Sequence, residues 1–183
     1  MTRSALAMLV SIALIAGCGG PTGPTRPNGL ALKPGTRPVE LGAGVTLTLP
    51  EGWTRDAQPP QGIAGRASWL VDGFECASVS LTVRPSDGLP LSQFFDRAIS
   101  SMEEHQRDIE VSGRDRFQAG PVAGYKYHYA ITQPQGTELG WRFFFERTGN
   151  VYELAFRLTK ECLAQGPDPS KAIAQIAGTL SVK

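Results

Sequence analysis

Three consecutive segments near the C-terminus, 125–131, 139–145 and 152–158, alternate apolar and polar residues with a period of two. Successive side chains point to opposite faces of a β-strand, so this period indicates strands with one face buried. Short turn signals separate the segments: Pro134-Gln135-Gly136 after the first and the tight-turn dipeptide Gly149-Asn150 after the second. The pattern therefore predicts an antiparallel meander of three long strands.

The remaining elements fit around this meander. Further alternation predicts strands at 45–49, 68–71, 77–83 and 109–118. Apolar residues at three- and four-residue spacing predict amphipathic helices over 91–102 and 169–180. Asp168 is the expected N-cap of the second helix, with Pro169 at its first position. The predicted fold class is α+β: a single-domain α/β/α sandwich with a mostly antiparallel sheet of about six or seven strands and helices on its faces.

The N-terminus carries a targeting signal. Arg3 precedes an apolar stretch from Ala5 to Ala16, which is typical of a secretory signal peptide and too short to cross a bilayer. The stretch ends in Ile15-Ala16-Gly17-Cys18, which resembles the lipobox of bacterial lipoproteins. This resemblance implies cleavage after residue 17 and fatty acylation of Cys18, with chains such as palmitate. Two acyl chains give stable anchoring, at about 0.8 kcal/mol per buried methylene. An ordinary secretory signal with an unrelated cysteine is the alternative.

A spacer and a folded domain follow the signal peptide. Residues 18–40 are rich in Gly, Pro and Thr and hold little apolar material, so we expect a lipidated, flexible spacer. Residues 41–183 have the size of one globular domain. Residues 1–17 hold one arginine and no acid, so their removal lowers the formal charge of +1 to zero. A neutral chain argues against nucleic-acid binding, which needs a basic surface.

Two cysteines remain after the one assigned to lipid. Cys76 and Cys162 would lie in an exported protein, where disulfides persist, so a bridge is expected. Two buried free thiols or part of a metal site are the alternatives. A metal site needs three or four ligands, and the only histidines, His105 and His128, lie in unrelated contexts. Neither a metal nor a cofactor is predicted.

The order of these elements resembles a known fold. The passages that carry the likeness are 45–53, an edge strand ending in Leu-Pro-Glu-Gly-Trp, the helix 91–102 after a strand, and 143–158 followed by a short helix. Together they resemble the Mog/PsbP-like fold, and within it the LpqN-type lipoproteins of actinobacteria. The resemblance covers roughly 140 residues. It implies an antiparallel sheet with helices on its faces and a non-catalytic accessory role, and it brings no catalytic residues.

Candidate binding and catalytic groups are few. His128, with Lys126 and Glu153 as neighbours, could act as a general base, although a histidine on the polar face of a strand is more often structural. Aromatic residues gather on the meander strands, where they form either the core beneath a helix or a groove for an apolar ligand. If Phe144 is exposed, it belongs to an apolar surface patch; if helices cover both faces, it is buried. The candidate ligand or partner face comprises Tyr125, Tyr127, Tyr129, Trp141 and Phe144.

The sequence thus predicts a non-enzymatic binding or accessory lipoprotein. Its lipid on Cys18 would hold it at the outer face of the cell membrane, where it would contact an envelope protein or lipid. A carrier or sensor of an apolar envelope lipid, in a pocket against the aromatic sheet, is the first alternative. A hydrolase with an unrecognised site is the second.

Overall fold

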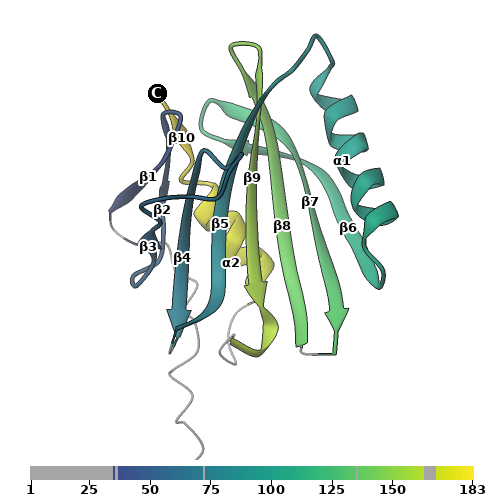
Figure 1. Ribbon diagram of the computed structural model, residues 1–183. Coiled ribbons are helices and arrows are strands. Elements are labelled where there is room, and N and C mark those ends of the chain that lie inside the picture. The colour runs from purple at the N-terminus through teal and green to yellow at the C-terminus, as the bar shows by residue number, and fades with distance from the viewer. Residues whose placement is uncertain (1–34, 36, 72, 135, 163–167) are drawn as a thin grey trace, which may run out of the picture.

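A seven-stranded antiparallel sheet forms the centre of the computed structural model, which describes residues 35, 37–71, 73–134, 136–162 and 168–183 (Figure 1). Its strands follow the order β3-β4-β5-β9-β8-β7-β6. They are β3 (Thr54–Arg55), β4 (Gly65–Val71), β5 (Phe74–Pro85), β6 (Ile109–Ala119), β7 (Val122–Gln133), β8 (Gly136–Arg147) and β9 (Asn150–Thr159). The predicted signal peptide, Cys18 and most of the predicted spacer lie outside the described residues.

The predicted meander is present as β7, β8 and β9, each antiparallel to the next. Arg147 pairs with Asn150 across a two-residue turn, so the turn residues are Thr148 and Gly149 rather than the predicted Gly149-Asn150. Both have positive φ, 49° and 74°. Two positive φ angles are the signature of a type I′ turn, whose twist matches that of the flanking strands.

A second, three-stranded sheet packs against the first and was not predicted as a separate sheet. It consists of β1 (Pro38–Gly42), β2 (Val45–Thr48) and β10 (Ser181–Val182), with β2 in the middle. The segment at 45–49 was expected as an edge strand, but β1 and β10 pair with its two sides. The predicted spacer also ended at residue 40, whereas β1 already begins at Pro38.

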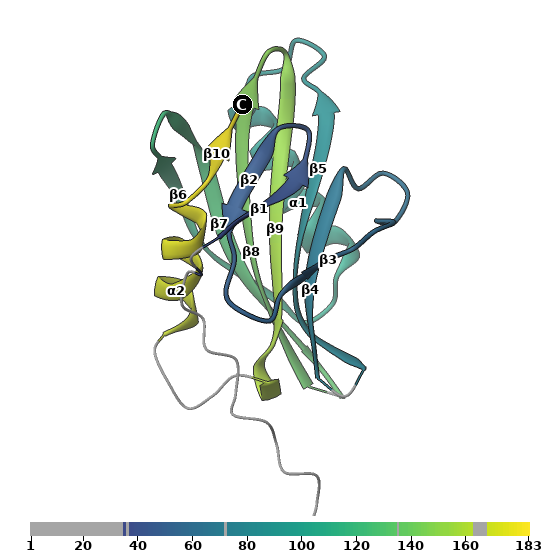
Figure 2. The ribbon, with the colours of Figure 1, turned by 90° about the vertical axis from the view of Figure 1, so that its left-hand side faces the viewer.

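Helix α2 (Pro169–Ala177) and the three-stranded sheet, called the small sheet below, lie on one face of the seven-stranded main sheet. Asp168 caps it as predicted, because its side chain accepts a hydrogen bond from the backbone N–H of Ser170. In Figure 2 the small sheet and α2 lie in front of the main sheet and α1 behind it. The large core on this face contains Leu47, Leu81 and Ile176, among others.

Helix α1 (Leu91–His105) covers the opposite face, where it packs on β6, β7 and β8. Its buried residues Phe95 and Ile99 join a smaller core with Tyr127, Phe144 and other aromatic and aliphatic side chains. The predicted three-layer α+β arrangement is thereby confirmed, with the small sheet as an additional part of one outer layer.

A bulge in β6 changes which face its side chains reach. The register to β7 shifts between Ser112 and Asp115, and Gly113 there has a φ of 61°. Before the bulge, Val111 packs in the core under α1; after it, Phe117 packs in the core on the α2 side. One strand therefore serves both cores, which a strict period of two cannot do.

Candidate functional site

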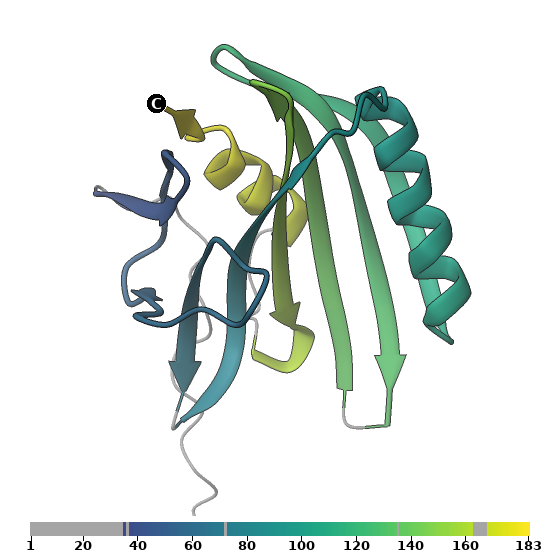
Figure 3. The ribbon, with the colours of Figure 1, turned by 45° about the horizontal axis from the view of Figure 1, so that its top comes forward.

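Helix α1 covers only half of its face of the main sheet. It contacts β6, β7 and β8 at one side, and in Figures 1 and 3 no described helix crosses the same face of β4, β5 and β9. The larger core, by contrast, has the small sheet and α2 over it. A hollow can therefore form beside α1, over the strands of this face that no described helix covers.

The bare half of the face is lined by small polar residues and charged residues. Pairing between β4, β5 and β9 places Ser68 opposite Ser78, and Ser78 opposite Arg157. Both serines are buried although no helix covers them. Ser80, Thr82 and Ala155 continue the same face along β5 and β9. Because these serine, threonine and alanine side chains are small, α1 protrudes beside them on this face of the sheet.

A groove of about 480 Å³ lies between α1 and the neighbouring strands β5, β8 and β9, and Thr82 is the part of this surface that it reaches. Its volume falls within the range typical of ligand pockets, roughly 300–1,000 Å³. Its lining comes from the end of β5 and the segment after it, from one side of α1, and from β8 and β9. The lining residues are Thr82, Arg84, Leu89, Phe94, Arg97, Ala98, Ser101, Met102, His105, Gln106, Arg142, Phe144, Val151 and Glu153.

An ion pair forms part of the floor of the groove. Arg142 on β8 pairs with Glu153 on β9, and both side chains are largely buried, being 26% and 12% exposed. Burial lowers the pKa of Arg142, but the charge of Glu153 and the nearby tyrosines outweigh it and raise this pKa. The guanidinium also lies 5.9 Å from the centre of the Tyr129 ring, within cation–π range. Arg142 is thus fixed in position as a permanent cation.

The ion pairs continue from Arg142 across the sheet. The Tyr129 hydroxyl donates a hydrogen bond to Glu138 at 3.0 Å, and Glu138 also pairs with Arg157. Burial, and then the negative charge of Glu138, raise the pKa of Tyr129 to about 12. The hydrogen bond to Glu138 is the largest cause of a raised pKa at Arg157. Tyr129 is therefore neutral and Arg157 positively charged over the whole physiological pH range.

The groove itself carries an excess of positive charge. Arg84, Arg97 and Arg142 line it, whereas Glu153 is the only acidic residue among the described residues of its lining. Arg84 is 61% exposed and lies 3.8 Å from Glu153, which already pairs with Arg142. Arg97 makes no ion pair with any described residue. Two of the three guanidinium groups are therefore available to an anion.

The predicted aromatic face is not a single face. Tyr125, Tyr127, Tyr129 and Phe144 lie together under α1, and Phe95 of α1 packs against Tyr125, Tyr127 and Phe144. Trp141 lies on the opposite face in the larger core, where its indole N–H donates to Ser170 of α2 at 3.3 Å. Tyr127 and Phe144 are almost completely buried. The expected patch thus belongs to two cores, and only Phe144 lines the groove.

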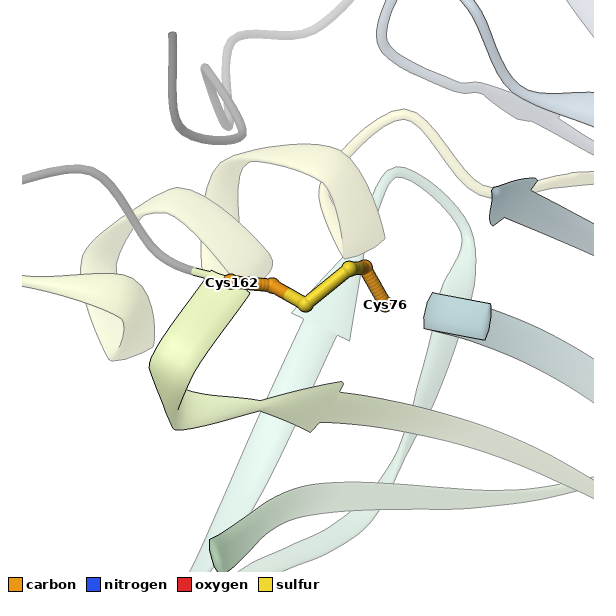
Figure 4. The surroundings of a disulfide bond; sticks show 2 residues. All are labelled: Cys76 and Cys162. Carbon is orange, nitrogen blue, oxygen red and sulfur yellow. A yellow bond between two sulfur atoms is a disulfide. The ribbon is translucent and has the colours of Figure 1, made fainter. Parts of the chain in front are cut away.

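The expected disulfide is present. Cys76 and Cys162 are bonded, with their Cα atoms 5.6 Å apart, and the bond ties the start of β5 to η1 (Lys160–Cys162) directly after β9 (Figure 4). This excludes the alternatives of two free thiols or a metal pair. It also locks the ends of the two neighbouring strands that form the bare face.

The histidines do not form the arrangement considered from the sequence. His128 is opposite Trp141 on the face of the larger core, whereas Glu153 lies on the other face of the sheet, so Glu153 cannot assist it. The His128 ring packs directly against Gly113 of the bulge, where a Cβ atom would overlap it. His105 lines the groove, and its Nδ1 lies 2.7 Å from the carbonyl oxygen of Ser101. Among the residues that the structure covers, no group of three or more His, Cys, Asp or Glu side chains could hold a metal.

Sequence reasoning missed the residues that give the groove its charge. Arg142 was visible only as a polar position of an alternating strand and Arg97 as a polar position of the helix, whereas Glu153 was considered only as a neighbour of His128. Their meeting depends on the order β5-β9-β8 and on the place where α1 crosses the sheet. Residues 84–97 hold two arginines and two aspartates, so no surplus of charge in the sequence pointed to this groove. None of the described helices has the length and apolarity needed to span a membrane.

Comparison with known proteins shows the fold. No protein-family model matches the chain, and no curated protein matches its sequence. Among solved structures it is similar to the Ran-binding protein Mog1p of Saccharomyces cerevisiae, with a TM-score of 0.57 and 13% identity over 82% of this chain and 96% of that one. It is also similar to Mycobacterium tuberculosis LpqN, which is involved in cell envelope biogenesis (TM-score 0.55, 10% identity, 78% and 85% covered). A Pseudomonas aeruginosa protein of unknown function matches with a TM-score of 0.54 and 19% identity, over 81% and 98%. These likenesses confirm the Mog/PsbP-like fold that the sequence predicts.

Proposed function

We propose that this chain is a non-enzymatic binding module of the cell envelope, held at the outer face of the membrane by lipid on Cys18, and that the groove beside α1 is its binding surface. The groove is the observation on which this proposal depends. It combines an apolar wall, a fixed ion pair and two available arginines within a volume suited to a ligand. These features bind and orient a partner and need no chemical step.

Three further observations support the proposal. The lipobox-like segment at 15–18 directly follows a signal-like stretch, so Cys18 is a suitable acyl acceptor. The disulfide between Cys76 and Cys162 fits an exported protein, because such bonds persist outside the cytosol. The similarity to LpqN, a protein involved in cell envelope biogenesis, agrees with a role in the envelope.

Membrane fractionation tests the anchor. We expect the parent chain in the membrane fraction, labelled by a radioactive or alkyne-bearing fatty acid. The Cys18→Ser variant should carry no label and lose membrane retention. Unlabelled parent protein with a mature N-terminus other than residue 18 would refute the anchor, whatever the groove does.

Photo-crosslinking in intact cells tests the groove. Ser100 and Ser101 are neighbouring exposed residues of α1, but only Ser101 lines the groove. A photoreactive phenylalanine at Ser101 should give adducts of defined mass, identifying a lipid or a protein, and the same group at Ser100 serves as the matched control. Adducts of equal yield from both positions would mean that the groove is not the binding surface.

A further inference from the structure

The side of α1 that faces the groove consists of two adjacent stripes of different character. Residues four apart on a helix lie on the same side, one turn above the other. Phe94, Ala98 and Met102 form an apolar stripe that is half-buried, because it packs against the core under α1 and also lines the groove. Arg97 and Ser101 form a polar, exposed stripe next to it. The helix thus presents an apolar strip bordered by a cation along the length of the groove.

The sheet side of the groove repeats this combination. Phe144 and Val151 supply an apolar floor that is buried with the core under α1. At the end where β5 leaves the sheet, the exposed Arg84 adds a second guanidinium that is not fully neutralised. The groove therefore pairs apolar lining with a net positive rim, although the mature chain as a whole is expected to be neutral.

This combination selects the chemistry of a ligand. A neutral apolar ligand would make no contact with the charge of the two exposed arginines, and a free inorganic anion would leave the apolar strip exposed to water. An anionic amphiphile satisfies both surfaces at once. Guanidinium groups recognise phosphate and carboxylate through paired N–H donors, so either head group suits the rim.

We propose that the groove binds an amphiphile with one alkyl chain and an anionic head group, a phosphate or a carboxylate. The head group contacts Arg97 and Arg84, and the chain lies along Phe94, Ala98 and Met102 above Phe144. This inference rests on the proposed function, because it names the ligand class of the same groove. It also specifies which end of the ligand each part of the groove recognises.

Calorimetric titration tests the inference on chain 19–183. Every buried residue described lies between Leu41 and Leu180, so this chain keeps the whole described core. The probes are dodecyl phosphate and laurate below their micelle concentrations, with dodecyl maltoside and inorganic phosphate as controls. We expect saturable one-to-one binding of the two anionic amphiphiles, with each added methylene strengthening binding by up to about fourfold until the groove is full.

Four variants locate the binding. Arg97→Ala should weaken dodecyl phosphate binding about tenfold, because it removes a charge-assisted contact. Arg55→Ala is the matched control: Arg55 is an exposed arginine of β3 that does not line the groove, and its loss should change nothing. Ala98→Trp should fill the apolar strip and abolish the dependence on chain length, with the melting temperature monitored to confirm folding. Arg97→Glu, a change at an exposed position, provides a second test if Ala98→Trp fails to fold.

Defined results would overturn the inference. Equal affinity for dodecyl maltoside would remove the role of the charge, and equal affinity for inorganic phosphate would remove the role of the chain. An equal loss from Arg55→Ala and Arg97→Ala would place binding elsewhere, and no binding of any amphiphile would refute the ligand class. If titration fails while crosslinks from Ser101 persist, the proposed function stands and only this ligand class is wrong. If both fail, the groove is not a binding surface.

Discussion

The disulfide makes a quantitative prediction about stability. Cys76 and Cys162 are 86 residues apart in sequence, so their bond closes a long loop in the unfolded chain. In the chain-entropy model a loop of this length corresponds to about 4–5 kcal/mol of stability at 25 °C. We therefore expect the double variant Cys76→Ala/Cys162→Ala of chain 19–183 to unfold with a free energy lower by about that amount. For a domain of this size, the melting temperature should fall by about 8–20 °C.

Urea unfolding followed by tryptophan fluorescence and circular dichroism measures this loss. The denaturant slope should rise in the variant, because an unfolded chain without the cross-link exposes more surface. Reduction of the parent chain is the control, and it should reproduce the loss to within about 1 kcal/mol, the remainder being the side-chain change at the buried Cys76. A difference below about 1 kcal/mol between the parent and the double variant would refute the reasoning.

Three further predictions concern the sheet. Glu153→Gln should lower the free energy of unfolding by about 2 kcal/mol in urea titrations. The loss should be smaller than for a fully buried ion pair, because the Arg142 side chain is 26% exposed. No loss would mean that this ion pair does not stabilise the fold. Burial raises the pKa of Tyr127 and brings that of Tyr129 to about 12, so both stay protonated in the folded chain while the unfolded chain ionises near pH 10. Stability should therefore be level below about pH 10 and decline from there towards pH 12. At least two of the four tyrosines should ionise, as followed at 295 nm, only on unfolding, and ionisation of three or more in the folded chain would contradict this assignment. Gly113→Ala should lower the free energy of unfolding by about 1–3 kcal/mol in urea titrations, because the position has a φ of 61° and a Cβ there meets the His128 ring. An unchanged free energy of unfolding would show that the bulge adjusts freely.

The sequence predicted the parts of the fold that depend on local periodicity. The meander, the helix from Leu91 and the capped helix at Asp168 all have strong patterns, and the structure has each of them. The pairing of Cys76 with Cys162 followed from the exported location and from counting cysteines. These features can be predicted without knowing which strands are neighbours in the sheet.

The features that sequence reasoning missed depend on topology. β1 and β10 are short strands far apart in the chain, and they become a sheet only through pairing with β2. Trp141 and Phe144 occupy opposite faces, as the alternation required, but periodicity alone could not tell which face α1 would cover. The groove is the clearest case, because Arg97 approaches Arg142 and Glu153 only where the helix crosses the sheet off centre.

An alternative surface makes the final test selective. Leu70 and Phe74, at the β4–β5 hairpin, are 52% and 65% exposed and could also attract an alkyl chain. NMR titration of isotope-labelled chain 19–183 with dodecyl phosphate distinguishes the two surfaces. We predict saturable shifts at the amides of Phe94, Arg97 and Ala98, and across β9 at Glu153, with α2 and the small sheet unaffected. Shifts centred on Leu70 and Phe74, or on α2, with none along α1, would contradict the assignment of the groove as the binding surface.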